Sequence, residues 1–342
     1  MKPVETEIVG YDPGAYQTAV AGTDGRLALV RSCVAVPSSR NVADRDLVTG
    51  CDWSGAQSPI EPYADGRFRF LRPDCSPMEL RQARAAAQRL ARHAVSHIVP
   101  HANGPLLGVI PLPSRASEFN RQFVGNSVRD LFDACLFVPS PLAISYGLNC
   151  LDRTLVVDVG AGTVDMSLID GEYPGMLDQI TLPVGLSRMD RAFQERVRTR
   201  HGIDLTVEEC RKLREQHGAV RGDVSDVVIT GTDCVPLDVS QCLAEACGEL
   251  VISITTALRE LAQGGSRKPE TVILTGGGSQ LNGLARVISD LIPESELIVP
   301  PRPALSAATG ALCMGQELSP ELWRELVLTA GDDVEMPARS AA

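Results

Sequence analysis

The chain has 342 residues, which at roughly 150 residues per domain suggests about two domains with sizeable cores. Hydrophobic residues make up 44% and charged residues 22%, a balance typical of soluble globular proteins that excludes a disordered chain. No apolar run of about 18 or more residues occurs, so we expect no transmembrane helix, and the N-terminus lacks the pattern of a secretory signal. The net charge of −11 disfavours nucleic acid as a partner.

Ten cysteines could indicate a disulfide or metal framework, but none of them forms a C-x-x-C pair. Several, such as Cys135 and Cys313, lie in apolar segments, where a reduced thiol behaves as a small hydrophobe. We therefore predict free, reduced cysteines in a cytoplasmic protein.

The N-terminal residues predict a β-hairpin. Strands over Glu7–Asp12 and Thr18–Ala21 flank a Pro13-Gly14 turn, and a further strand is expected over Leu27–Val36. Residues 37–76 are rich in Ser, Asp, Gly and Pro, which indicates a loop.

A capped helix should follow this loop, because Ser76 is a suitable N-cap with Pro77 at N1 and Glu79 at N3. Apolar residues recur at helical spacing up to Ile98, and Pro100 ends the pattern. The rest of the first half predicts a strand over Leu106–Pro111, a helix over Ser114–Ala134, a strand over Leu136–Val138 and a helix over Pro141–Leu148.

The second half repeats the pattern of the first. Thr154–Val159 and Val164–Ile169 again predict two strands around a Gly-rich turn, with Asp158 closing the first strand as Asp12 does. Further elements are expected as helices over Ser187–Arg200, Thr206–Glu215, Ser240–Ala262 and Asn282–Leu291, a buried strand over Thr271–Thr275, and a capped helix beginning near Leu318.

These Gly-rich turns favour a phosphate site. Without a Cβ, a glycine turn lets backbone N–H groups approach phosphate oxygens, so two facing turns suit a nucleoside triphosphate. Asp12 and Asp158 can accept hydrogen bonds from the waters of a Mg²⁺ ion. A third such turn, Thr275–Ser279, allows a ribose and base to pass close to the backbone. One turn alone would be ordinary turn chemistry, but three in this order predict nucleotide binding.

The motif Asp158-x-Gly160-x-Gly162-Thr163-x-Asp165 resembles the second phosphate loop of the actin, Hsp70 and sugar-kinase ATPases, and Thr275–Ser279 resembles their adenosine motif. Within that superfamily the chain is most similar to bacterial actins of the magnetosome-filament (MamK) group. This similarity also rests on Val109–Ser117, Tyr146-Gly147-Leu148, Gly276–Leu284 and Gln316–Trp323.

The resemblance implies an α/β, actin-like (ribonuclease H-like) duplicated fold with a nucleotide cleft between two lobes. Domain I would comprise residues 1–150 and 305–342, with a reduced subdomain around 37–75. Domain II would comprise residues 151–304, with a small inserted subdomain around 204–240. The implied cofactors are ATP or ADP and Mg²⁺. The implied partners are further copies of the chain in a cytoplasmic filament, and a magnetosome or other membrane-associated adaptor protein.

The resemblance also assigns roles to residues. Asp12 and Asp158 would orient Mg²⁺ and its waters, and Gly185 would lie near the ribose. Arg214 and Glu215 stand where such actins present a Lys-Glu pair to adenine and ribose; the alternative for this pair is a solvated helix face. The residues expected to contact the phosphates and adenosine through their backbone or side chains are Gly14, Ala15, Tyr16, Gly160, Ala161, Gly162, Thr163, Gly276, Gly277, Gly278 and Ser279.

Two departures from the family pattern affect catalysis. The hydrolytic carboxylate of the family precedes a proline, and here that position is Ser140, whose hydroxyl is a poor general base. Ala15 stands where the family offers a hydroxyl. We therefore expect nucleotide binding with slow or absent hydrolysis.

Three functions remain open at this point: a polymerising cytoskeletal protein, a small-molecule kinase of the same superfamily, and a non-polymerising adaptor of a membrane machine. The histidines His93, His97 and His101 have helical spacing, but Pro100 interrupts it, so we interpret them as a cationic helix end. The same helix carries a row of arginines that we interpret as a solvated face, or a contact for a neighbouring protomer or an acidic membrane partner: Arg81, Arg84, Arg89 and Arg92.

Overall fold

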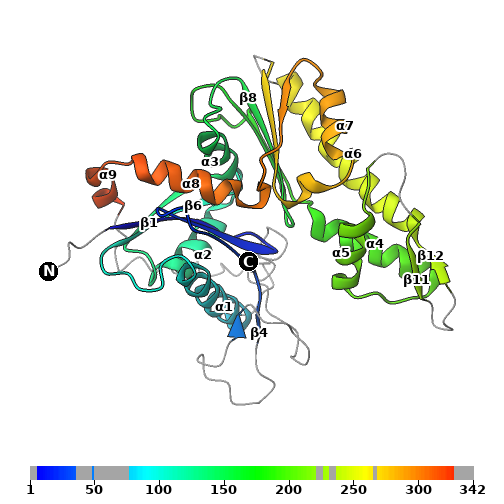
Figure 1. Ribbon diagram of the computed structural model, residues 1–342, viewed down its shortest axis with the longest axis horizontal. Coiled ribbons are helices and arrows are strands. Elements are labelled where there is room, and N and C mark those ends of the chain that lie inside the picture. Colours follow the sequence, from blue (N-terminus) through cyan, green and yellow to red (C-terminus); the bar gives the residue numbers. More distant parts are fainter. Residues whose placement is uncertain are drawn as a thin grey trace, which may run out of the picture.

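The computed structural model describes residues 6–35, 48–49, 77–220, 226–230, 236–264 and 268–326. It confirms the expected duplicated α/β architecture, with two five-stranded sheets built on the same plan (Figure 1). We call the first sheet with its covering helices the first lobe, and the second sheet with its helices the second lobe.

The first sheet has the order β3-β2-β1-β6-β7. β1 pairs antiparallel with β2, the predicted hairpin, and parallel with β6. The register places Val9 opposite Gly22 on one side and Gly108 on the other. The strand bounds are Glu7–Asp12 (β1), Gln17–Gly22 (β2), Leu27–Arg31 (β3), Leu106–Leu112 (β6) and Ala134–Pro139 (β7).

The second sheet has the order β10-β9-β8-β13-β14, and its central strand again pairs antiparallel with the next strand in sequence and parallel with a later one. The register sets Asp158 opposite Asp165 on β9 and opposite Thr275 on β13. The strand bounds are Thr154–Val159 (β8), Val164–Ile169 (β9), Gln179–Leu182 (β10), Thr271–Thr275 (β13) and Glu296–Ile298 (β14).

Each sheet buries an apolar face against its own helices. On the first, α1 (Pro77–Ser96) and α2 (Glu118–Val128) enclose a core that includes Tyr11 and Leu90. On the second, the core residue Phe193 comes from α4, which packs against α6. The helices of the second lobe are α4 (Leu186–His201), α5 (Val207–His217), α6 (Ser240–Gly264) and α7 (Leu284–Leu291).

Among the described helices, α6 is long and apolar enough over Ser240–Leu261 to cross a membrane by length and composition. Its position gives the apolar residues another role, because Leu243 and Ile254 are fully buried in the second core. Glu245 on the same helix pairs with Arg196 and Arg200 of α4. The helix therefore packs as an amphipathic core helix of this lobe.

Two helices lie between the sheets and join the lobes (Figure 1). α3 (Ser140–Gly147) packs against β8 and β9 of the second sheet and against α8 (Ser306–Glu317), which covers β1 and β6 of the first. The helices cross at Gly147 and Gly310, where a Cβ added to Gly310 would lie 1.8 Å from the Ala143 carbonyl oxygen. One residue before Gly147, the Tyr146 hydroxyl donates to Glu317 at the C-terminal end of α8, and this hydrogen bond raises the pKa of Tyr146 to about 12.

Several predicted elements differ from the observed ones. The strand expected over Leu27–Val36 is two strands, β3 and the short β4 (Val34–Ala35), and β4 pairs with β5 (Val48–Thr49). The helix expected from Ser114 begins only after the N-cap Ser117, whose hydroxyl accepts from the Asn120 N–H. Sequence patterns did not predict α8, the edge strands β10 and β14, or the hairpin of β11 (Val228–Thr230) and β12 (Pro236–Asp238).

Other expectations are confirmed, including the strands of both hairpins, the long helix from Ser240 and the capped helix α9 (Pro320–Glu325). The proposed N-cap Ser76 and most of the loop 37–76 lie outside the described residues. The seven cysteines that the structure describes are all free, while Cys51, Cys75 and Cys234 lie outside the described residues.

His93 lies in the last turn of α1, as the sequence predicts, but its surroundings disfavour the charged form. Its ring nitrogen lies 3.4 Å from that of His97, and burial together with His97 lowers the pKa of His93, so it favours the neutral form. α1 ends at Ser96, before His101.

The helix crossing predicts the effect of a single methyl group. We expect Gly310→Ala to destabilise the protein by about 1–3 kcal/mol, because the new Cβ overlaps the Ala143 carbonyl and forces α3 and α8 apart. Gly248→Ala in α6 is the matched control, since its Cβ would meet nothing within 4 Å and should stabilise the helix by roughly 0.5–1 kcal/mol. Urea unfolding of both variants measures the difference, and equal stabilities would contradict the crossing.

Candidate nucleotide site

A cavity of about 850 Å³ opens between the lobes, and both contribute to its walls. The turn after β1 comes from the first lobe, the start of α3 lies between the lobes, and the turns after β8 and β13 come from the second. The C-terminal end of α5 and residues 216–219 complete the second wall. The strand ends of both sheets therefore face one another across the cavity, which is the common position of ligand sites in α/β folds.

The turn after β1 is fixed within its own lobe by Ser32. The Ser32 hydroxyl donates to the Gly14 carbonyl at 2.6 Å, and the Ser32 N–H donates to the Tyr16 carbonyl at 2.9 Å. Ser32 is buried and its hydroxyl lies 2.8 Å from that of Thr18, so this support is shielded from solvent. The carbonyls of the turn are therefore held from within the lobe, while the turn itself lines the cavity.

The turn after β13 requires glycine at its first position. Gly276 has φ of +77°, and a Cβ there would lie 2.4 Å from an Asp158 carboxylate oxygen. The turn then continues as a short 3₁₀ helix, Gly277–Gln280. The close approach packs the third turn directly on the carboxylate of Asp158, the next-to-last residue of β8.

Two half-buried carboxylates, Asp12 and Asp158, form the floor of the cavity. Desolvation raises the pKa of Asp12 to about 7. Desolvation, together with repulsion from Asp12 and Asp165, raises the pKa of Asp158 to about 8. No cation of the described chain contributes to either shift. The floor therefore holds two acidic groups whose negative charge the described residues do not neutralise.

This floor fits a hydrated Mg²⁺ ion. Mg²⁺ prefers oxygen ligands and keeps several of its waters, from which the carboxylates of Asp12 and Asp158 can accept hydrogen bonds. The described residues contain no group of three or more His, Cys, Asp or Glu side chains placed to hold a metal by themselves. A magnesium ion here would therefore be bound through water and a ligand's phosphates, as the donor set favours.

Asp165 differs from the other two aspartates because it bridges the lobes. It accepts from the Ser114 N–H at 2.7 Å and from the Thr181 hydroxyl at 2.6 Å. Ser114 follows β6 of the first lobe, whereas Asp165 and Thr181 lie on β9 and β10 of the second. Burial still raises the pKa of Asp165 to about 6, with these hydrogen bonds acting against it. The Asp165 carboxylate therefore links the two lobes beside the cavity.

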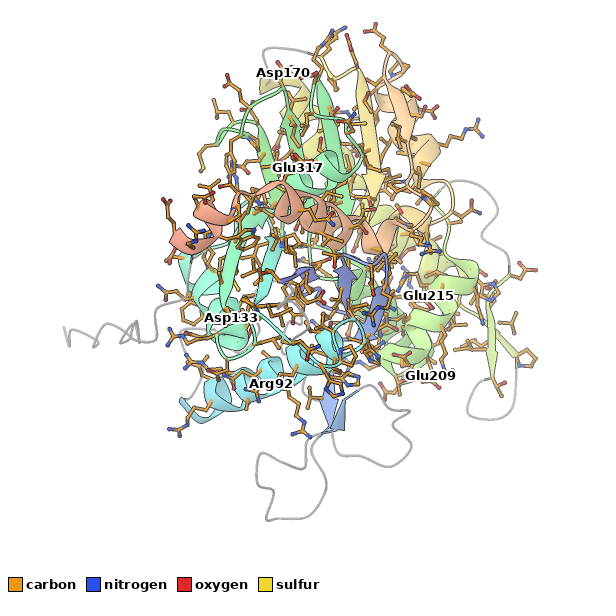
Figure 2. The ribbon with its side chains drawn as sticks, turned by 60° about the vertical axis from the view of Figure 1, so that its left-hand side comes forward. Arg92, Asp133, Asp170, Glu209, Glu215 and Glu317 are labelled. Atoms are coloured by element: carbon orange, nitrogen blue, oxygen red, sulfur yellow. The ribbon has the colours of Figure 1, made fainter. Side chains whose placement is uncertain are left out.

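α5 presents a buried ion pair to the cavity. Its N-terminus is set by a capping box between Thr206 and Glu209, and Figure 2 labels Glu209 and Glu215 along this helix. The Arg214 side chain is 9% exposed and its Nε donates to Asp190 Oδ1 at 2.7 Å. Asp190 on α4 is fully buried and also lies 3.5 Å from Arg211. The Glu215 side chain is 54% exposed.

Comparison with known proteins agrees with this geometry. The family model of the MreB/Mbl proteins matches residues 85–320, more than half of the chain. The chain belongs to the MreB/Mbl family. Its relatives include the actin-like protein MamK of Magnetospirillum gryphiswaldense, 28% identical over 93% of this chain and 91% of that protein. The MamK of Paramagnetospirillum magneticum is also 28% identical, over 93% and 94% of the two chains.

Solved structures of the family share the fold over nearly the whole chain. A subunit of a MamK double helical filament has a TM-score of 0.81 at 25% identity, covering 92% of this chain and all of that one. A non-polymerising point mutant of MamK bound to AMPPNP has a TM-score of 0.65 at 26% identity, and the match covers 92% of this chain and 99% of that one. MreB5 of Spiroplasma citri bound to ADP has a TM-score of 0.70 at 15% identity, covering 92% and 97%, which shows the fold alone.

In this MreB/Mbl member, most of the residues singled out from the sequence meet at the cavity. Gly185 and Ser279 do not line it: Gly185 caps α4 against the second turn, where a Cβ would lie 2.6 Å from the Ala161 carbonyl oxygen, and the Ser279 hydroxyl donates to the Gly276 carbonyl. The residues that line it are Asp12, Gly14, Ala15, Tyr16, Ser140, Asp158, Gly160, Ala161, Gly162, Thr163, Arg214, Glu215, Gly276, Gly277 and Gly278.

The alternative of a solvated helix face is wrong for Arg214, which is buried against Asp190, although Glu215 is exposed. The sequence did contain a signal for this pair. Asp190 falls on the apolar face of the predicted helix from Ser187, among Met189 and Phe193, and a carboxylate on such a face needs a buried partner. Arg211, which also lines the cavity, was missed because only the fold brings it to Asp190.

The raised pKa values predict how stability changes with pH in the absence of nucleotide and metal. The folded state holds protons on Asp12 and Asp158 between pH 4 and pH 8 that the unfolded state has lost, so stability should fall as pH rises. Each extra proton contributes at most about 1.4 kcal/mol per pH unit. We expect urea unfolding at pH 5, 6, 7 and 8 to show this fall, and Asp158→Asn to flatten it. If the free energy of unfolding fell equally steeply with pH in the wild-type protein and in Asp158→Asn, the raised pKa of Asp158 would be contradicted.

Proposed function

We propose that this protein is a nucleotide-dependent bacterial actin that binds ATP or ADP with Mg²⁺ between its lobes and assembles into filaments. The observation that carries the proposal is the pair of glycine turns facing one cavity above the unneutralised Asp12 and Asp158. The relatives support it, since MamK is solved as a double helical filament and a MamK mutant is solved with AMPPNP.

Different residues that line the cavity would contact different parts of the nucleotide. The backbone of Gly14–Tyr16 and of Gly160–Thr163 would bind the phosphates, and Asp12 and Asp158 would orient the waters of Mg²⁺. When bound, the metal would neutralise phosphate charge. Arg214, held in place by Asp190, would pack on the base, and the exposed Glu215 would accept ribose hydroxyls. Gly276–Gly278 would pack on the adenosine.

Hydrolysis should be slow because of Ser140. This residue opens α3, is buried and lines the cavity at the position where the family places its hydrolytic carboxylate. A neutral hydroxyl can bind a water but removes its proton poorly. A persistent ATP state would then give long-lived filaments.

The cellular role follows from similarity to MamK, the magnetosome filament protein. We propose a cytoplasmic filament that organises or positions magnetosomes, joined to them by a membrane-associated adaptor protein. Nucleotide between the lobes would set their relative angle, and a head-to-tail interface sensitive to that angle would make assembly nucleotide-dependent. The uncharged Ser140 also favours a second candidate, a non-polymerising actin-like adaptor, and sedimentation separates the two.

Assembly should depend on Asp158. We expect the wild-type protein to sediment with Mg–ATP and to remain in solution without nucleotide, and Asp158→Ala to remain in solution in both conditions. Asp24→Asn is the control, because Asp24 lies in an exposed turn and pairs with the neighbouring Arg26. Wild-type protein that binds ATP but never sediments would support the adaptor function instead.

Restoring a carboxylate should accelerate hydrolysis. A general base contributes typically 10²–10⁴-fold, so we expect Ser140→Glu to raise phosphate release by at least about tenfold. Ser140→Ala should stay at the wild-type rate, which separates the carboxylate from any effect of the substitution site. A wild-type rate as high as that of the glutamate variant would refute slow hydrolysis.

A further inference from the structure

We propose that Tyr16, Arg31, Arg211 and Glu208 form a clasp that closes the nucleotide cleft and limits nucleotide release. The inference rests on the proposed nucleotide function. It concerns how the bound molecule is retained rather than how its phosphates are bound.

The centre of the clasp is the Tyr16 ring, on which two guanidinium groups stack. The Arg31 Cζ lies 3.6 Å from the ring centroid and the Arg211 Cζ lies 3.7 Å from it. Both distances are well inside the range of about 6 Å over which cation–π attraction acts.

Two cations on one ring would repel each other without carboxylates beside them. One oxygen of Glu208 lies 3.3 Å from Arg31 and 2.9 Å from Arg211, so this carboxylate offsets part of the repulsion between them. At the inner end, Asp190 pairs with Arg211 and also holds Arg214 at the cavity wall. The cluster therefore carries carboxylates beside its cations at both ends.

The clasp can form only when the lobes are closed. Tyr16 and Arg31 belong to the first lobe, in the turn after β1 and at the end of β3. Glu208 and Arg211 belong to α5 of the second lobe. Because Ser32 already fixes the turn of Tyr16 within the first lobe, the contact with Arg211 is not needed to shape that turn. Its distinct effect is to join the two walls of the cavity.

Burial increases along the clasp from solvent to the cavity. The Glu208 side chain is 49% exposed, Arg31 is 27% exposed and Arg211 is 6% exposed. Cation–π and ionic contacts strengthen as water is excluded, so the inner contact with Arg211 contributes most. Because Tyr16 and Arg211 both line the cavity, separation of this contact would widen the path for a phosphate chain bound between the turns at residues 13–16 and 160–163.

The first test needs no nucleotide. Hydrogen exchange of the full chain should show faster exchange over residues 207–214 in Arg31→Gln, because a change in the first lobe then loosens α5 of the second. Glu208→Gln should do the same, and its exposed position argues against misfolding as the cause. Arg26→Gln is the matched control, since Arg26 precedes the same strand β3 and pairs within its own lobe. Unchanged exchange over residues 207–214 in both clasp variants would overturn the proposal.

The second test measures release of a fluorescent ATP analogue from the Mg²⁺-loaded protein. We expect release about tenfold faster in Arg31→Gln and Glu208→Gln, and unchanged in Arg26→Gln. Tyr16→Leu should also be fast, and adding Arg31→Gln to it should cause no further increase, because the ring that Arg31 stacks on is gone. Release at the wild-type rate in the clasp variants would overturn the clasp, whereas a wild-type protein that binds no analogue would overturn the nucleotide function and leave hydrogen exchange to decide the clasp.

Discussion

Two carboxylates of like charge, brought together on the floor of one cavity, are the constraint on which the rest of this structure depends. Asp12 is the last residue and Asp158 the next-to-last residue of the central strands of two sheets of the same plan, and desolvation raises the pKa of both. Folding alone leaves the cost of ionising this pair uncompensated, so both groups hold protons that an ordinary aspartate would lose. A hydrated Mg²⁺ ion with a phosphate chain would offset that cost, and the glycine turns on either side leave room for such a ligand.

Three of the contacts described between the lobes differ in physical character. Behind the cavity, α3 and α8 cross through glycines at a contact too close for any side chain. Beside it, the Asp165 carboxylate accepts from a backbone N–H of the other lobe. At its edge, the Tyr16 ring stacks with guanidinium groups from both lobes. The first contact is rigid and the last is partly exposed, so opening should begin at the clasp and pivot about the helix crossing.

Much of this architecture could be predicted from the sequence because its signals are local. A strand, a glycine turn and an aspartate at the strand end are adjacent in the chain, and they occur twice. α8 was missed because its small residues, such as Ala308, Gly310 and Ala311, are buried on several sides and leave no apolar period.

The contacts between elements could not be predicted, for another reason. The Arg214 Nε lies 2.7 Å from Asp190 Oδ1 only because α4 and α5 pack together, and Tyr16 reaches Arg211 only because the lobes close. Pairings at such sequence separations are decided by the tertiary fold, which local spacing does not encode. The cavity walls and their glycines were therefore predictable, but not the ion pairs that hold the walls in place.

Cryo-electron microscopy of the full chain mixed with Mg²⁺ and a non-hydrolysable ATP analogue tests the central claim most directly. The account predicts filaments in which each subunit holds the analogue between residues 13–16 and 160–163, with density for a metal between its phosphates and the carboxylates of Asp12 and Asp158. Subunits with an empty cleft, or with the analogue bound elsewhere, would contradict it.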